Sequence, residues 1–400
     1  MLETQNSPPP QDILEQLQQR AAANLFTPAI ADVTLQEQVD YVCRCLSNRA
    51  GVRLLMACLL AKLAEPHIDP RKPYTEIGDS DSFSGRTYDE RYITPFINHY
   101  RLPVNPTTAF LTPTLRNRNQ ALTRDQTLVG RPRALYQTTL ELLDDVAAER
   151  VTAQDLLTEI LRILMLLRDE KLARISALLQ SLDLSQDAPP LSSEAIITLI
   201  SQHLACKNAS RLPVLVVAAA YDIAGPALKE QRLALQAHNA ADLQTGSLGD
   251  LEITTRQPSD IEGIESDSLE SAITEADRAE IVTVYEMKLK RVTQDDIEGA
   301  IAKIARAKAP IQNYLFVTTE AIDPAVTAYA NSFYQRSQGI EIAILDCISF
   351  LRHFLHLFHR QRTHYLNAYQ ALVLQEPDSA VSQTLKEAFL ALRQTAESDE

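Results

Sequence analysis

The stretch VYEMK at residues 284–288 is the part of the sequence that says most about the fold and the chemistry. On an extended strand, successive side chains point to opposite faces of a sheet. Glu286 and Lys288 are therefore expected on one face of a strand. The apolar residues that alternate with them are expected to face the core: Tyr285, Met287 and Leu289. Such a strand is half buried, and its charged pair lies at the edge of a folded core.

A second acidic stretch, GDLEI at 249–253, alternates in the same way and lies upstream. Two neighbouring strands can bring Asp250, Glu286 and Lys288 to one point. Carboxylate oxygens favour Mg²⁺, which keeps several waters and also accepts a phosphate oxygen. Such a metal lowers the pKa of a bound water, and a lysine beside it can orient or help deprotonate that water and can screen the developing negative charge. The trio therefore predicts phosphodiester hydrolysis, against the alternative of a solvated ion pair on a strand edge.

Around these stretches, the C-terminal half alternates between strand and helix periods. Strands are expected around 251–253, 282–284, 314–318 and 340–345. Thr293 and Asp296 resemble a capping box that opens one helix, and Asp323 followed by proline opens another. One long helix is expected over 350–374. This order predicts an α/β or α+β core, with a mixed sheet flanked by helices.

The N-terminal half follows a helical period instead. Two or three amphipathic helices are expected between residues 11 and 62, and two more at 134–150 and 152–182. Eight prolines between residues 66 and 132 predict an irregular region there. The segment SQDAPPLSS at 185–193 is the best candidate in the sequence for a linker between domains. We therefore expect a mainly helical domain over 1–190 and a catalytic domain over 191–400.

Composition narrows the class of protein. The chain has 400 residues, 45% of them apolar, and a formal net charge of −14, which excludes a charge-coated, histone-like nucleic-acid binder but not a local basic cleft. Its five cysteines form no C-x-x-C pair, so a disulfide framework or zinc ribbon is not expected. The N-terminus does not resemble a signal peptide, and the apolar stretch 212–220 is shorter than the about 20 residues that a bilayer requires. A soluble, cytoplasmic protein with no membrane partner is expected.

DNA binding requires positive charge, and residues 85–133 carry an excess of it. This region contains eight arginines, three acids and no lysine. The planar guanidinium suits guanine edges and phosphates. This region is therefore predicted to contact DNA, against the alternative of a surface loop whose arginines pair with nearby acids. The residues chosen as DNA contacts are Arg86, Arg91, Arg116, Asn117 and Arg118.

A second basic segment, 351–364, holds three arginines and four of the eight histidines. His353, His356 and His359 recur every three residues, a spacing that drifts around a helix of 3.6 residues per turn. We therefore expect an amphipathic helix near DNA or at a subunit contact, and not a metal site.

Several longer stretches resemble the SacI-type family of type II restriction endonucleases, within the PD-(D/E)xK nuclease superfamily. The stretches are RLPVLVVAAAYDIAGPALKE at 211–230, LQTGSLGDLEI at 243–253, VYEMKLKRVTQDDIEGAIAKI at 284–304, LDCISFLRHFLHLFHRQRT at 345–363, GRTYDERYI at 85–93 and NPTTAFLTPTLRN at 105–117. The resemblance implies a nuclease core of that superfamily and an enzyme that cuts both strands of a short palindromic duplex with Mg²⁺. It makes GAGCTC the first site to test, and it implies a DNA methyltransferase in the same restriction-modification system.

Carried over by motif, Asp250 and Glu286 are the metal carboxylates and Lys288 is the catalytic lysine. Glu252, on the same strand face, is a further candidate ligand that substitutes for Asp250 or assists it. Gly249 stands where the motif name has proline. The gap between the two acids holds an insert at 259–280 with eight acids and one arginine. A solvated loop or short helix is favoured for this insert over a regulatory or metal-binding role.

A palindromic target calls for two-fold symmetry, so we expect a homodimer with one catalytic centre per strand. Two alternatives stay open at this point. The first is a structure-dependent or methylation-dependent nuclease with the same catalytic trio. The second is a non-catalytic DNA-binding or interaction protein.

Overall fold

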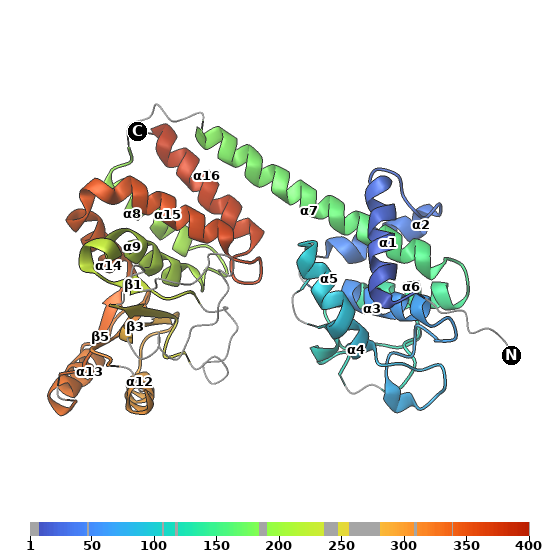
Figure 1. The fold of residues 1–400 in the computed structure, drawn as a ribbon, viewed down its shortest axis with the longest axis horizontal. Coiled ribbons are helices and arrows are strands. Elements are labelled where there is room, and N and C mark those ends of the chain that lie inside the picture. Colours follow the sequence, from blue (N-terminus) through green and yellow to red (C-terminus); the bar gives the residue numbers. More distant parts are fainter. Residues whose placement is uncertain are drawn as a thin grey trace, which may run out of the picture. The chain divides into compact units, whose positions relative to one another are not determined.

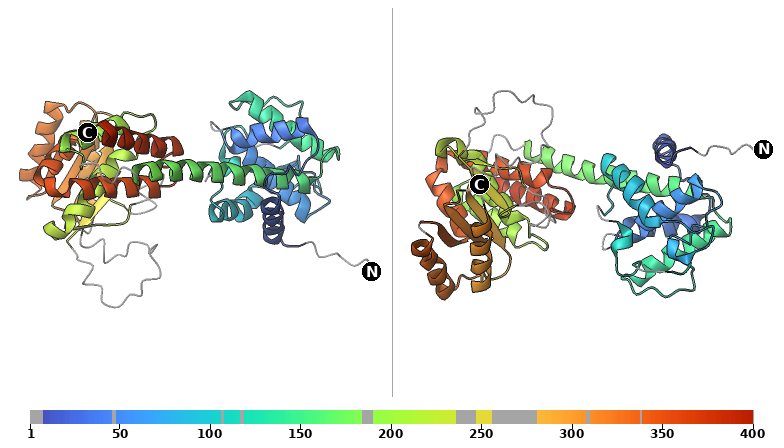
Figure 2. Two further views of the ribbon diagram at one scale, coloured as in Figure 1. Left: turned by 90° about the horizontal axis from the view of Figure 1, so that it is seen from above. Right: turned by 60° about the horizontal axis from the view of Figure 1, so that its bottom comes forward.

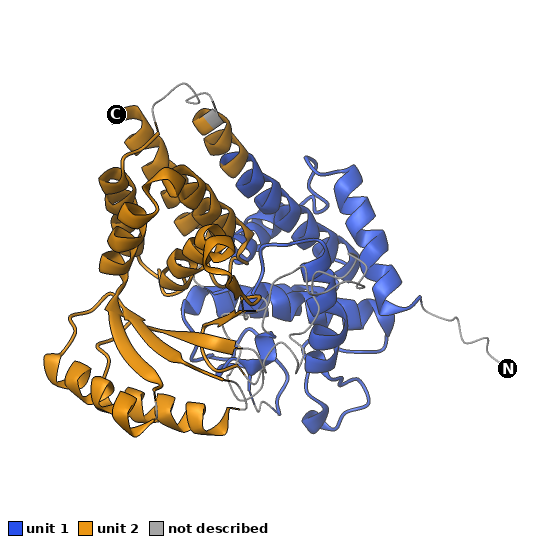
Figure 3. Cartoon of the chain, turned by 60° about the vertical axis from the view of Figure 1, so that its left-hand side comes forward, with its two compact units in different colours: residues 1–174 blue, residues 175–400 orange. Residues whose placement is uncertain are grey.

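The computed structural model describes residues 8–45, 48–105, 108–116, 119–183, 190–235, 247–255, 281–307, 310–337 and 339–399. The chain forms two compact units, residues 1–174 and residues 175–400 (Figure 3). It is a mainly helical α+β protein, with a five-stranded mixed sheet in the second unit (Figure 1). Within the described ranges, no helix has the length and the apolar character needed to span a bilayer.

The first unit is built around a buried helix. Its helices are α1 (Pro10–Ala23), α2 (Val33–Arg44), α3 (Ala50–Ala64), α4 (Gly85–Tyr88), α5 (Thr94–His99), α6 (Arg133–Ala147) and the first part of α7 (Ala153–Asp183). Helix α3 is buried on every side. A helix that is apolar all round belongs at the centre of a core, and α1, α2 and α6 pack against it. The helices expected before residue 62 and over 134–150 and 152–182 are present, but α3 is buried on every side and is not amphipathic as expected.

A buried ion pair fixes the irregular region between α3 and α6. Arg53 of α3 and Asp89 have side chains that are 0% exposed, and Arg53 Nη2 lies 2.6 Å from Asp89 Oδ1. Arg53 also donates to the carbonyl of Asn105. The second carboxylate oxygen of Asp89 accepts from the N–H of Ala109 at 2.9 Å and from the hydroxyl of Thr108. Because a buried charge is tolerated only when it is fully paired, this cluster holds the segment in one conformation.

The second unit carries the sheet. Its strands are β1 (Gln231–Arg232), β2 (Leu251–Thr254), β3 (Ile281–Lys288), β4 (Asn313–Thr318) and β5 (Glu341–Asp346), and they lie in that order. β1, β2 and β3 pair antiparallel, whereas β3, β4 and β5 pair parallel. The parallel pairs are joined by α12 (Gln294–Arg306) and α13 (Pro324–Arg336). The capping box of Thr293 and Asp296 is present at the start of α12, as the sequence predicts.

Helices cover both faces of this sheet (Figures 1 and 2). On one face, Val284, Tyr314 and Phe316 pack with Ile297 and Ala300 of α12. On the other face, Tyr285 and its neighbours pack into a larger helical core. The helices of that core are α8 (Ser193–Leu204), α9 (Leu212–Leu228), α14 (Cys347–Leu357), α15 (Arg362–Gln375) and α16 (Gln383–Asp399). The sheet is therefore the rigid middle layer from which the charged residues of β3 project.

Two local expectations were wrong. Leu289, expected to face the core, is 52% exposed because β3 ends at Lys288 and the strand alternation stops there. The single helix expected over 350–374 is two helices, α14 and α15, with a 3-10 turn between them. Phe358 at the break has a non-helical backbone, and its ring stacks on Phe354 with 5.0 Å between ring centroids. This break lets both α14 and α15 bury an apolar side in the same core.

Candidate active site

Asp250 lies beside the E-x-K stretch of β3 because the chain approaches that strand very closely at Gly249. A Cβ atom on Gly249 would lie 2.6 Å from the carbonyl oxygen of Tyr285 and 2.6 Å from Cγ1 of Val284. The N–H of Asp250 then donates to the Tyr285 carbonyl at 2.8 Å. Its carboxylate accepts from the N–H of Met287 at 2.7 Å, in place of a backbone carbonyl. Asp250 is therefore anchored on both sides of Glu286, through its own N–H to Tyr285 and through its carboxylate to Met287.

Glu286 sits at the centre of a charged cluster and is mostly buried. Its Oε1 lies 2.7 Å from Nζ of Lys288, and its Oε2 lies 2.9 Å from Nζ of Lys303. The hydroxyl of Tyr314 also donates to Oε2. Burial raises the pKa of Glu286, but the hydrogen bonds from Lys288 and Tyr314 and the charge of Lys303 outweigh this and hold the pKa below its ordinary value. Glu286 is therefore a carboxylate at neutral pH.

Lys288 bridges two acids and is not poised as a base. Its Nζ lies 2.9 Å from Oδ1 of Asp296, in addition to Glu286, and it lies over the ring of Phe316 at 5.9 Å from the centroid. Burial lowers the pKa of Lys288, but the hydrogen bonds to the two carboxylates raise it above its ordinary value. Lys288 therefore stays an ammonium at neutral pH and acts through its charge.

The second acid of the upstream stretch has a different position. Glu252 is buried, and its Oε1 accepts from the N–H of Leu248 at 2.6 Å and from the hydroxyl of Ser247 at 3.1 Å. This arrangement closes the turn that leads into Gly249 and Asp250. The structure thus places Glu286 and Lys288 in contact and Asp250 against the backbone N–H between them, whereas Glu252 supports the turn before Asp250.

The sequence analysis did not identify Lys303 and Tyr314 as members of this cluster, and it identified Asp296 only as a helix-capping residue. Lys303 and Asp296 lie on α12, seven residues apart, which puts them on the same side of a helix. Asp296 accepts from the N–H of Thr293 with Oδ2 and from Lys288 with Oδ1. Tyr314 of β4 is fully buried, and its hydroxyl also lies 3.0 Å from the carbonyl of Leu248, so its single proton is shared between this carbonyl and Glu286. The helical spacing of Asp296 and Lys303 was the available signal.

The chemistry of this donor set fits Mg²⁺. The carboxylate of Asp250 is bound to the backbone N–H that follows Glu286, at one end of β3, and Mg²⁺ in proteins is held by one or two carboxylates with waters and phosphate oxygens. Among the residues that the structure describes, no group of three or more His, Cys, Asp or Glu side chains is placed to hold a metal ion. The pair Asp250 and Glu286 is therefore the candidate ligand set.

Three of the predicted DNA contacts in the first unit, Arg86, Arg91 and Arg116, are exposed. Arg86 is paired with Glu90 at 2.7 Å, Arg91 lies over the ring of Tyr92, and Arg116 donates to a backbone carbonyl at 3.3 Å. Asn117 and Arg118 lie outside the described residues. Arg124, in the same region, is held by Asp144 and Asp145 at 3.1 and 3.0 Å. Some of these arginines are thus neutralised by acids within the unit, and others present their charge to solvent.

The basic segment of α14 has a partner within its own unit. Arg352 and His356 both contact Glu194 of α8, at 2.9 and 3.3 Å. Of the three histidines spaced by three, His353 and His359 are exposed, as is His356. The acidic insert at 259–280 lies outside the described residues.

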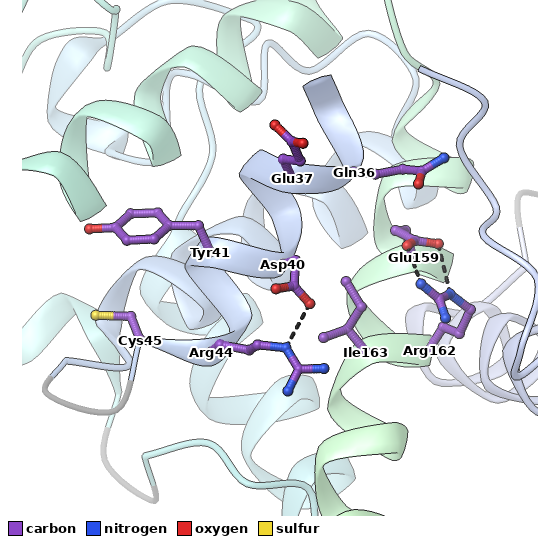
Figure 4. Close-up of a pocket in the computed structure, with 9 residues that line it drawn as sticks. All are labelled: Gln36, Glu37, Asp40, Tyr41, Arg44, Cys45, Glu159, Arg162 and Ile163. Carbon is purple, nitrogen blue, oxygen red and sulfur yellow. Dashed lines mark hydrogen bonds and ion pairs between the residues drawn. The ribbon is translucent and has the colours of Figure 1, made fainter. Parts of the chain in front are cut away.

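A separate pocket of about 550 Å³ lies in the first unit, between α2 and α7 (Figure 4). Four of its charged residues form two ion pairs. Arg44 contacts Asp40 at 2.7 Å, and Nε of Arg162 contacts Glu159 at 3.0 Å. None of the residues predicted to act on DNA lines it. The pocket is therefore unrelated to the carboxylate cluster.

Comparison with models of known protein families and with curated proteins gives no match for this chain.

Proposed function

We propose that this protein is a Mg²⁺-dependent, site-specific endodeoxyribonuclease of the type II restriction class, with a PD-(D/E)xK nuclease core in its C-terminal unit. The observation that carries the proposal is the joint position of Asp250, Glu286 and Lys288 at the end of β3. Glu286 and Lys288 are in contact on this strand, and Asp250, just before the antiparallel neighbour β2, is bound to the backbone N–H between them. Phosphodiester hydrolysis needs these groups, because negative charge builds on the phosphate as the bond breaks.

Each residue then has a distinct role. Asp250 and Glu286 would hold the divalent ion, which supplies a more acidic water and neutralises phosphate charge when it is bound. Lys288 stabilises negative charge on the scissile phosphate, because its raised pKa keeps it protonated. Tyr314 and Asp296 orient Glu286 and Lys288, and Glu252 fixes the turn that carries Asp250.

The exposed arginines of residues 85–133 would contact DNA phosphates and bases, with the palindromic target read by a homodimer. The resemblance makes GAGCTC the first target and implies a protecting methyltransferase. These parts of the proposal rest on the arginine content and on the sequence resemblance.

The decisive experiment is digestion of unmodified plasmid DNA with the purified protein and Mg²⁺, followed by sequencing of the ends. Discrete fragments with identical ends are expected, and EDTA should abolish them. Parallel digestion of the same DNA with and without methylation separates this proposal from a methylation-dependent nuclease. Binding without any cleavage of matched, mismatched or branched duplexes would leave the non-catalytic alternative.

A further inference from the structure

The contact between Lys303 and Glu286 has a consequence for metal binding. Lys303 Nζ lies 2.9 Å from Oε2 of Glu286, one of the two carboxylates that would hold the divalent ion. An ammonium at hydrogen-bond distance occupies the lone pairs that a cation needs, and it repels that cation at short range. A divalent ion that binds Glu286 through Oε2 must therefore displace Lys303.

The two lysines contact different oxygens of Glu286 and come from different elements. Lys288 comes from the rigid strand β3 and has a second carboxylate partner in Asp296, so it keeps an anchor when Glu286 turns to a metal. Lys303 reaches the same carboxylate from helix α12, across 17 residues of sequence, with a side chain that is 30% exposed. A long lysine side chain at a partly exposed position can move to a new partner by rotation about its own bonds.

We propose that Lys303 is the counter-ion of Glu286 in the metal-free protein, and that a divalent cation takes its place. This inference rests on the proposed function, since it assumes that Glu286 is a metal ligand. Lys303 would be a positioning residue: it keeps the Glu286 carboxylate ordered and neutralised until the metal arrives, and it thereby sets the metal affinity of the site. Once displaced, its ammonium lies beside the site, where it can contact a DNA phosphate.

The test is calorimetric titration of the DNA-free protein with CaCl₂ and with MgCl₂. Lys303→Met should bind each ion about tenfold more tightly than the wild type, because no ammonium has to be displaced. Lys303→Arg keeps the charge and should bind no more tightly than the wild type. Lys290→Met removes one exposed positive charge nearby, just beyond the end of β3, and controls for net charge, so its affinity should stay within about twofold.

Glu286→Gln tests whether Glu286 binds the metal, separately from the counter-ion role of Lys303. If it binds Ca²⁺ and Mg²⁺ as tightly as the wild type, the metal is not held at Glu286 and the proposed function fails. If Glu286→Gln loses binding while Lys303→Met matches the wild type, only the counter-ion role is overturned. An equal gain in Lys303→Met and Lys290→Met would also overturn it, because the effect would then be a general one of charge. Circular dichroism and the melting temperature report whether each variant is folded.

Discussion

The carboxylate of Asp250 accepts a hydrogen bond of 2.7 Å from the backbone N–H of Met287, the residue between Glu286 and Lys288. This bond ties the acid of one strand to the E-x-K stretch of the next. Because a backbone N–H is fixed by the sheet, Asp250 cannot turn away without breaking a hydrogen bond of the strand pair. The candidate active site is thus held by backbone geometry as well as by side-chain charge.

Removing a charge of the central pair should stop cleavage while DNA binding persists. Glu286→Ala and Lys288→Ala are each expected to lower the rate of plasmid cleavage by about three orders of magnitude, because each removes electrostatic stabilisation at the reacting phosphate. Duplex affinity, measured by fluorescence anisotropy, should change only a few-fold. The exposed Lys290→Ala serves as the matched control. Wild-type cleavage by both active-site variants would remove the catalytic assignment.

Gly249 should tolerate no side chain. In Gly249→Ala the new methyl group meets the Tyr285 carbonyl and Val284, so the turn must shift and the hydrogen bond from Asp250 to Tyr285 is lost. We expect a loss of about 1–3 kcal/mol in the free energy of unfolding and at least about tenfold slower cleavage. In Gly299→Ala, within α12, the added methyl meets nothing within 4 Å and should stabilise the protein slightly. Equal behaviour of the two variants in urea unfolding and cleavage assays would contradict this reading of the turn.

Arginines that present their charge to solvent should govern the salt dependence of DNA binding. Each phosphate contact contributes about −0.9 to the slope of log affinity against log salt concentration. Arg116→Ala should therefore make the slope less steep by about one, as measured by anisotropy titrations between low and physiological salt. Arg124 is the matched control, since Asp144 and Asp145 already neutralise it. A slope unchanged by Arg116→Ala would exclude this residue as a phosphate contact.

The buried pair of Arg53 and Asp89 should matter for stability far more than an exposed pair. Arg53→Met leaves the Asp89 carboxylate buried without its ion-pair partner, which costs about 3–5 kcal/mol of unfolding free energy. The comparison is Arg86→Met, which breaks the exposed pair with Glu90 and should cost less than about 1 kcal/mol. Both values come from urea denaturation. Similar losses in the two variants would mean that the cluster does not organise the irregular region.

His203 should make the protein less stable in mild acid. It is fully buried; Nδ1 lies 3.0 Å from the Tyr369 hydroxyl and Nε2 lies 3.0 Å from the Leu385 carbonyl. Burial lowers the pKa of His203 to about 4, although the hydrogen bond to Leu385 opposes this. Between pH 6.5 and 4, His203 binds a proton in the unfolded chain but stays neutral in the folded protein. The free energy of unfolding therefore falls as the pH drops from 6.5 toward 4.

The expected loss from His203 is about 2 kcal/mol between pH 7.5 and pH 5, at about 1.4 kcal/mol per pH unit below 6.5. Urea denaturation of the wild type and of His203→Gln at both pH values measures it, since the amide of Gln can replace both hydrogen bonds without titrating. The variant should lose less stability than the wild type by that amount. Parallel pH dependences of the two proteins would show that His203 titrates normally.

Local patterns in the sequence were sufficient for much of the fold. The alternation around Glu286, the capping box at Thr293 and Asp296, and the proline after Asp323 each act within a few residues, so they predicted β3, α12 and α13 without tertiary information. The same alternation placed Glu286 and Lys288 on one face. The end of β3 at Lys288 and the break at Phe358 were not predicted, because they depend on how the chain packs in the helical core.

The tertiary structure determines which charged side chains lie in contact with one another. By strand alternation, Asp250 and Glu252 lie on the same face and are equivalent candidates. The close approach of Gly249 to Tyr285 places the Asp250 carboxylate against the N–H of Met287, whereas Glu252 binds the N–H of Leu248 and stabilises the preceding turn. Lys303 is a helix residue 17 positions from Glu286, and only the packing of α12 on the sheet brings its ammonium to that carboxylate. A strand period fixes which side of the chain a group is on, because it is a property of the backbone. Distances between groups on different elements arise only when the core closes, since they depend on every side chain packed between them.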